Sequence, residues 1–334
     1  MFRPIVLILT SILTLLNASP AEAKLKDFVK LDKFSDVNLG LWASGDGDQT
    51  WTNLHCVASS NYNNKFNDPP PIKTPPAVHM PYQFRVKDRA APAGYYLYLD
   101  DDDTNTGSSR LQVSFEHRDI KEGTAFEGLS DNVYDAHGHD GQFNKCKNGK
   151  NSELRLVINS AELSKARAGT YTGNFQFRVR GGSSGTKVRS RQISFTIDVA
   201  ESVRISGLNN IPLGSWSGVG DLTGSETFCI YSNNAAAAYN VLISSSQQDG
   251  AGNFRLANGT LTSFINYSIR FADSALGAGV AVGLLPLSGN GSNGQADCGG
   301  VSNARLIVDL AEVDLVGSSS DTYSDTITLL VAPE

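Results

Sequence analysis

The sequence predicts an all-β protein made of two immunoglobulin-like antiparallel β-sandwich domains. Three observations support this prediction: apolar and polar residues alternate over short stretches, glycine-rich turns separate those stretches, and one unit of sequence occurs twice. The chain of 334 residues contains 32 glycines and 40% hydrophobic residues. Such a composition provides many turns and enough apolar side chains for a core, and it disfavours long helices.

The predicted strands are stretches in which β-branched and aromatic residues alternate with polar ones. Examples are 154–158, 174–179, 192–199, 239–243 and 326–331. Short strands between turns rich in Gly, Asn, Ser and Asp, with a pair of cysteines in each unit, are typical of an immunoglobulin-like sandwich.

The repeat is visible at five landmarks that follow in the same order and at similar spacing. In the first half they are Trp42, Cys56, Cys146, Arg155 and Tyr171, and in the second half Trp216, Cys229, Cys298, Arg305 and Tyr323. A match of this kind indicates a duplicated domain. We predict an N-terminal domain over 24–200 and a C-terminal domain over 201–334.

Residues 1–23 have the features of a secretory signal peptide. Arg3 precedes an apolar run over 5–16, and small residues follow up to Ala23, as at a signal cleavage site. The apolar run is too short for a membrane anchor, so we expect export of the chain and no membrane span.

Export implies an oxidising compartment, in which the four cysteines can form two disulfides. Four cysteines allow three pairings, but each repeat contains one pair. The repeat therefore favours Cys56–Cys146 and Cys229–Cys298, which would close loops of about 90 and 70 residues and stabilise each domain by ~4 kcal/mol in the chain-entropy model.

The two copies end differently. Two predicted strands follow Tyr171, whereas only eleven residues follow Tyr323, which is room for one strand. The C-terminal domain is therefore expected to lack its last strand and to expose an apolar groove at Ile327, Leu329 and Val331. A strand from another chain would fill such a groove. The alternative is that 326–331 is already the last strand and that an earlier strand is missing or rearranged.

Four segments carry a resemblance to a known family. The LG-x-W motifs that end at Trp42 and Trp216, the FCIYSNN segment around Cys229 and the closing TYSDTITLLV segment resemble the archaic chaperone-usher pilus subunits, which include spore coat protein U domains and two-domain Csu-type tip adhesins. The resemblance covers most of the mature chain. It implies an exported subunit that is held by a periplasmic pilus chaperone, passes an outer-membrane usher and joins an adjacent pilin by strand exchange.

The chain departs from the stalk subunits of that family at its N-terminus. Stalk subunits carry an alternating donor strand ahead of the first domain, but here only 24–33 precedes the repeat, and it is lysine-rich and alternates poorly. The resemblance then implies a tip adhesin at the cell surface, at the end of a pilus. The alternatives are a spore-coat or pilus-stalk subunit and a secreted carbohydrate-binding protein or enzyme that folds unaided.

The N-terminal domain carries the candidate binding loops. Its cysteines have 89 residues between them and those of the second domain 68, so about 21 residues are inserted, and insertions in loops often carry function. Csu-type tips bind abiotic surfaces through exposed hydrophobic loops, and the resemblance implies a similar surface here. Its expected members are Tyr62, Phe66, Ile72, Val78, Met80, Tyr82, Tyr95 and Tyr96. The alternative is that these side chains pack inward.

Other functions have little support in the sequence. A net charge of -6 without a basic cluster disfavours nucleic acid, and no catalytic motif is present. The run 100–103 and the set Asp135, His137, His139 and Asp140 have the chemistry of metal ligands, but their spacing is not that of a known site. We therefore predict neither enzymatic activity nor a metal or cofactor.

Overall fold

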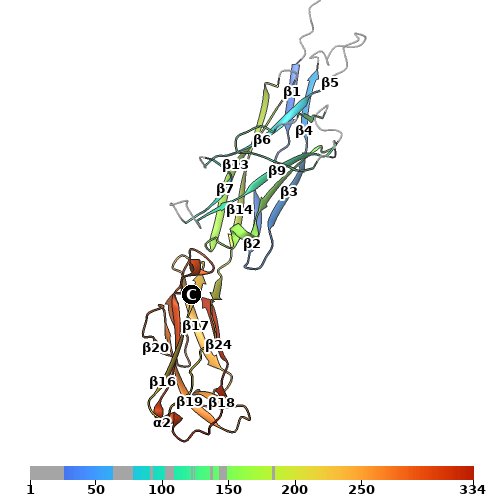
Figure 1. Ribbon diagram of the computed structural model, residues 1–334. Helices are drawn as coiled ribbons and strands as arrows, with labels where there is room; N and C mark the ends of the chain where they lie inside the picture. Colours follow the sequence, from blue (N-terminus) through green and yellow to red (C-terminus); the bar gives the residue numbers. More distant parts are fainter. Residues whose placement is uncertain are drawn as a thin grey trace, which may run out of the picture.

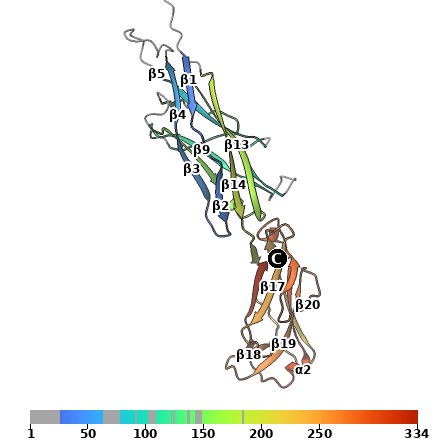
Figure 2. The same ribbon diagram turned by 180° about the vertical axis from the view of Figure 1, so that it is seen from behind.

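The computed structural model describes residues 26–62, 78–90, 93–101, 109–121, 123, 125–135, 138–142, 149–182 and 185–334. The predicted all-β fold is confirmed: besides strands, these residues include two short helices, α1 (Ser160–Leu163) and α2 (Glu312–Leu315), and the 3-10 turn η2 (Cys298–Gly300). Two β bodies lie end to end, as Figures 1 and 2 show from opposite sides. Within the described residues, no helix has the length and apolar character needed to cross a membrane.

The first domain is a sandwich of two main sheets with a small third sheet. Its strands are β1 (Lys26–Leu31), β2 (Val37–Trp42), β3 (Gln49–His55), β4 (Val57–Tyr62), β5 (Val78–His79), β6 (Pro81–Asp88), β7 (Tyr96–Leu99), β8 (Arg110–Gln112), β9 (Ser114–Asp119), β10 (Glu127–Gly128), β11 (His139–Asp140), β12 (Ser152–Ile158), β13 (Gly169–Gly181) and β14 (Lys187–Val199). One main sheet has the order β10-β9-β12-β3, the other β11-β6-β13-β14-β2, and β1-β4-β5 form the third.

The core of the first domain is aromatic and is completed by β14. Alternate residues of β14 point inward, so that Ile193, Phe195, Ile197 and Val199 are all buried. The Phe195 ring meets the Trp51 ring edge to face at 5.0 Å between centroids. The strict alternation along β14 follows from the two-residue period of a strand, and it gives the last strand a large share of the core.

The second domain is built from a shorter set of strands. They are β15 (Val203–Ser206), β16 (Leu222–Ser232), β17 (Ala238–Ser245), β18 (Phe254–Asn258), β19 (Phe264–Ala272), β20 (Val280–Ala281), β21 (Leu287–Asn290), β22 (Ala304–Leu310), β23 (Tyr323–Ser324) and β24 (Ile327–Pro333). One sheet has the order β15-β16-β22-β19-β18-β23, and the other has β21-β17-β24. All five predicted strands lie within or largely overlap observed ones.

The two tryptophans of the sequence repeat make equivalent hydrogen bonds in the two domains. The indole Nε1 of Trp42 donates to the carbonyl oxygen of Gly47 at 3.1 Å, and Nε1 of Trp216 donates to that of Gly220 at 2.8 Å. The two residues therefore close the same kind of turn at the entry of each domain.

The tyrosines of the repeat also make the same contact. The hydroxyl of Tyr171 donates to the carbonyl oxygen of Arg167 at 2.9 Å, and that of Tyr323 donates to the carbonyl oxygen of Ser319 at 3.3 Å. In both cases the acceptor lies four residues upstream, which is the arrangement of the tyrosine corner in immunoglobulin-like sandwiches.

Asn233 ties the two domains together where β14 leads into β15. Its backbone carbonyl oxygen accepts from the amide of Ala168 at 2.8 Å. Its side chain donates to the carbonyl oxygen of Ala200 at 2.9 Å and accepts from the amide of Ser202 at 2.7 Å. The linker is therefore hydrogen-bonded on both sides of the boundary.

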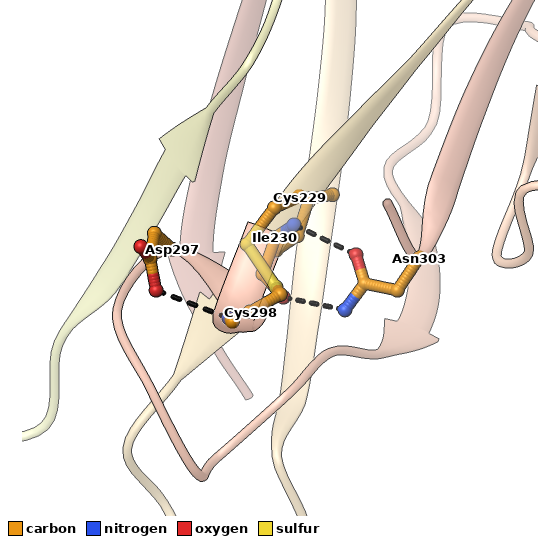
Figure 3. Close-up of a disulfide and its surroundings, with 6 residues drawn as sticks. Cys229, Ile230, Asp297, Cys298 and Asn303 are labelled. Carbon is orange, nitrogen blue, oxygen red and sulfur yellow. Dashed lines mark hydrogen bonds between the residues drawn. A yellow bond between two sulfur atoms is a disulfide. The ribbon is translucent and has the colours of Figure 1, made fainter. Parts of the chain in front are cut away.

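The disulfide Cys229–Cys298 is confirmed and joins β16 to η2 (Figure 3). Its Cα atoms are 5.9 Å apart. Beside it, the Asn303 side chain accepts from the amide of Ile230 at 2.8 Å and donates to the carbonyl oxygen of the same residue at 2.9 Å. Cys56 is also disulfide-bonded, and Cys146, its predicted partner, lies outside the described residues.

Removing the second disulfide should destabilise the C-terminal domain markedly. Because the bond spans 69 positions of the chain, the C229S/C298S variant should lose about 4 kcal/mol of unfolding free energy in the chain-entropy model. Urea unfolding of this variant beside the wild type measures the difference. A loss below about 1 kcal/mol would show that loop closure contributes little to this domain.

Candidate functional site

The last strand of the second domain has a neighbour on one edge alone. β24 pairs with β17, with Leu329 opposite Ile243, just as β13 pairs with β6 in the first domain. On its other edge β13 pairs with β14, whereas no strand of the fully described second domain occupies the corresponding edge of β24. The absent strand is therefore the counterpart of β14, and the alternative that an earlier strand is missing is wrong.

The place of the absent strand is a groove. We define the acceptor groove as the cleft of about 630 Å³ between residues 208–214 and 323–329. Its lining also includes side chains of β18, β19 and β22, namely Leu256, Tyr267, Leu306 and Val308. Residues 208–214 form no strand, although they correspond to β2, because the strand with which they would pair is absent.

The burial of the β24 side chains also indicates that a strand is absent beside them. In the first domain Phe175, Phe177 and Val179 of β13 are fully buried, with 0% exposure. The register against the preceding strand makes Ile327, Leu329 and Val331 their counterparts. All three of these pack against the second core but are only partly buried. Of the predicted groove residues, Ile327 and Leu329 line the acceptor groove, whereas Val331 lies beyond its lining.

In the first domain, β14 fills the space that corresponds to the acceptor groove. β14 runs antiparallel to β13 and parallel to β2, so that it fills the space between them. A strand in the acceptor groove would lie in the same way between β24 and 208–214. It would need apolar side chains at alternate positions, as Ile193, Phe195 and Ile197 supply in β14.

Asp325 fixes one end of the groove. Its carboxylate accepts from the hydroxyl of Tyr267 at 2.6 Å and from that of Ser246 at 2.8 Å, and it also meets the Ser245 hydroxyl. Burial and the bond to Asp325 raise the pKa of Tyr267, so its hydroxyl stays protonated and donates. These bonds hold the chain in place where it enters β24.

The predicted contact surface of the first domain is wrong at two of its members. Tyr82 and Tyr95 are 1% and 5% exposed, since Tyr82 lies on the inner face of β6 together with Phe84 and Val86. Met80 and Tyr96 are partly exposed. The remaining members lie outside the described residues or have side chains that do: Tyr62, Phe66, Ile72 and Val78.

The segment ahead of the first repeat belongs to the first domain. Residues Lys26–Leu31 form β1, which pairs antiparallel with β4, and Val29 and Leu31 are buried at 3% and 0% exposure. Poor alternation in the sequence concealed this strand. In the structure this strand is thus part of its own domain.

A basic cavity lies on the first domain beside β1 and β3. It measures about 430 Å³, and its lining includes four cationic side chains, Lys30, Lys33, Lys150 and Arg191. Its one acidic member, Asp32, already accepts from the amide of Cys56 at 2.9 Å. In a chain of net charge -6, this cavity has the chemistry to hold a carboxylate or phosphate group.

Three highly exposed leucines lie in the second domain and were not predicted as a contact surface. Leu276, Leu284 and Leu285 are 92%, 72% and 79% exposed in the segment between β19 and β21. The leucines of this segment were visible in the sequence, but whether they face inward depends on tertiary packing. Clustered apolar residues at a surface often mark contacts with other proteins.

Comparison with known proteins gives a distant structural likeness. No protein-family model and no curated protein matches the chain. The chain is similar to the CsuC–CsuE complex of a chaperone and a tip adhesion subunit from Acinetobacter baumannii, with 11% identity, 89% of this chain and 98% of that chain covered and a TM-score of 0.43.

Two further structures are similar to the chain. For CfaE, the adhesive subunit of CFA/I fimbria of enterotoxigenic Escherichia coli, identity is 11%, coverage 90% of this chain and 93% of that one, and the TM-score 0.38. For the CupB6 tip adhesin of Pseudomonas aeruginosa, identity is 8%, coverage is 92% of this chain and 95% of that one, and the TM-score is 0.36. Each of the three structures contains an adhesive subunit. The functional proposal below rests on the residues of this chain.

Proposed function

We propose that the chain is a tip adhesin of a chaperone-usher pilus. Its C-terminal domain receives a strand from the adjacent pilin, and its N-terminal domain attaches the fibre to a surface or to a host or biofilm component. The observation that supports this proposal is the acceptor groove along β24, where the counterpart of β14 is absent.

The groove has the properties that strand donation requires. One edge of β24 has unpaired backbone groups, and such edges are rarely left uncovered. Beside that edge, Ile327, Leu329 and Val331 are only partly buried, so an incoming strand would remove apolar surface from water. Backbone hydrogen bonds to β24 would hold the incoming strand, and its alternate side chains would determine the specificity.

The proposed terminal position in the fibre is supported by the pairing of β1. A stalk subunit must both accept and donate a strand, but the residues ahead of β2 that are described here pair with β4 in their own domain. A subunit that accepts and does not donate can occupy only the end of a fibre. This favours a tip adhesin over a stalk or coat subunit.

A chaperone is the expected partner before assembly, because the open groove would otherwise invite aggregation. Periplasmic yield of the chain should therefore fall several-fold when no pilus chaperone is co-expressed with it. The matched control is a variant in which a second copy of residues 182–199 follows Pro333, since this copy can fill the groove from within the chain. It should be recovered equally with and without the chaperone. Equal yields of the wild type under both conditions would contradict the proposal.

A further inference from the structure

Three ligand-bearing side chains meet between the two sheets of the first domain. His117 comes from the inner face of β9, Asp135 from the segment before β11, and His139 from β11 itself. They are 1%, 9% and 2% exposed. β9 belongs to one main sheet, while β11 pairs with β6 in the other, so the cluster spans the interior of the sandwich.

The distances within the cluster are those of ligands around one ion. Nδ1 of His117 lies 3.2 Å from Oδ2 of Asp135, and Nε2 of His139 lies 2.9 Å from the same oxygen. Ligand atoms about 2.0–2.1 Å from a tetrahedral zinc ion are themselves about 3.3 Å apart. All the ligand atoms lie within 4.8 Å of one another, so a small rotation of the imidazoles closes the set.

A chain of hydrogen bonds fixes the proton positions on His117. Nδ1 of His55 meets the carbonyl oxygen of Asn53 at 3.2 Å and must donate to it. His55 is 1% exposed and carries its proton on Nδ1, so its Nε2 accepts from the Ser152 hydroxyl at 2.8 Å. That hydroxyl then accepts from Nε2 of His117 at 2.7 Å.

This chain leaves Nδ1 of His117 as the nitrogen that faces the carboxylate. Nδ1 is buried and makes no hydrogen bond of acceptable geometry, although Oδ2 of Asp135 is within 3.2 Å. A lone pair and a carboxylate at this distance repel each other unless a cation lies between them. A proton would require a straight N–H···O contact, whereas two ligands of one metal ion point at the ion and not at each other.

The carboxylate is held in place for this role. Oδ1 of Asp135 accepts from the amide of Phe84 at 2.8 Å, and the amide of Asp135 donates to the carbonyl oxygen of Phe84 at 2.9 Å. Both bonds attach Asp135 to β6, while Oδ2 remains directed at the two imidazoles. The oxygen that would bind an ion is thus positioned by the sheet opposite β9.

We propose that His117, Asp135 and His139 bind a divalent transition-metal ion, zinc in the first place, which links the two sheets of the N-terminal domain. Two imidazole nitrogens and one carboxylate oxygen suit zinc, whereas calcium and magnesium prefer oxygen ligands alone. A bound ion would join β9 to β6 and β11 in the manner of a cross-link. The sequence suggested Asp135 and His139 as ligands but gave no reason to add His117, which is 18 positions earlier.

Zinc binding by the mature chain, residues 24–334, tests this site directly. After treatment with a chelator, the protein should bind one equivalent of Zn²⁺ in a calorimetric titration, and saturating zinc should raise the melting temperature of the N-terminal domain by about 5 °C or more. Calcium should cause no shift. Cobalt should give the intense visible absorption of a tetrahedral site.

Matched variants assign the ligands. H117Q and H139Q should each weaken zinc binding by about 100-fold or more, and H79Q, which changes an exposed histidine, should leave it unchanged. If a variant fails to fold, the titration of the wild type still shows whether the chain binds zinc. Absence of zinc uptake by the wild type would overturn the proposal, and so would uptake that is unchanged in a folded H117Q/H139Q variant.

Discussion

A second copy of residues 182–199, attached directly after Pro333, is expected to raise the melting temperature of the C-terminal domain by about 10 °C or more. In the first domain these residues follow β13 and form β14, and Gly181 pairs with Lys187. Gly181 pairs with Tyr82 across β6, as Pro333 pairs with Tyr239 across β17. The attached copy would therefore enter the groove in the register that β14 has in its own domain.

The gain would come from apolar surface on both sides of the groove. Four inward side chains of the copy, each contributing ~1.5–3 kcal/mol when buried, would fill the acceptor groove. In the β14 register the copy of Ile193 lies opposite Ile327, and the copies of Phe195 and Ile197 lie opposite Asp325 and Tyr323. Part of this is lost to ordering the added strand, so the net effect is smaller than the sum. Differential scanning calorimetry resolves the two domains and gives the shift of each.

The control graft carries Asp at the copies of Phe195 and Ile197. Its backbone can still pair with β24, but its buried face is charged, so it should produce no rise in melting temperature. If both grafts raise the melting temperature equally, or if neither does, the groove along β24 does not accept an alternating apolar strand.

Alanine at equivalent positions of the two domains should have unequal effects. Phe175 is fully buried, so F175A should cost about 3–5 kcal/mol of unfolding free energy. Its counterpart Ile327 is only partly buried, and I327A should cost about 1 kcal/mol in the lone chain. In the grafted chain the copy of Ile193 lies opposite Ile327, as Ile193 lies opposite Phe175, and I327A should cost about 2–4 kcal/mol.

L330A is the control for this series, because Leu330 is 64% exposed on the outer face of β24. It should have little effect in either chain. Denaturant unfolding monitored for each domain gives the values. An I327A cost that is the same with and without the graft would show that the added strand does not cover this residue.

The strands and the missing strand could be predicted because they depend on local pattern and on counting. Alternation located β14 and β24, and the number of residues after Tyr171 and Tyr323 showed that one strand lacked a counterpart. Because Tyr171 and Tyr323 form equivalent tyrosine corners, the residues that follow each of them can be counted from the same structural position. These signals need no knowledge of how distant segments pack.

The binding surface could not be predicted in the same way. An aromatic residue in a loop insertion can face either way, and Tyr82 and Tyr95 proved to lie in the core. Likewise, β1 alternates poorly yet buries Leu31, because a strand at a sheet edge can keep polar residues on both faces. His117 meets Asp135 only through the packing of two sheets, which no spacing in the sequence reveals.

Amide hydrogen exchange along β24 tests the central claim most directly. Alternate amides of an edge strand point away from its neighbour, so half of those between Ile327 and Pro333 should exchange rapidly in the lone chain. The same amides should become protected in the grafted chain or in the complex with an adjacent pilin. Protection of all β24 amides in the lone chain would mean that the C-terminal domain is already complete, and it would contradict the proposed mode of assembly.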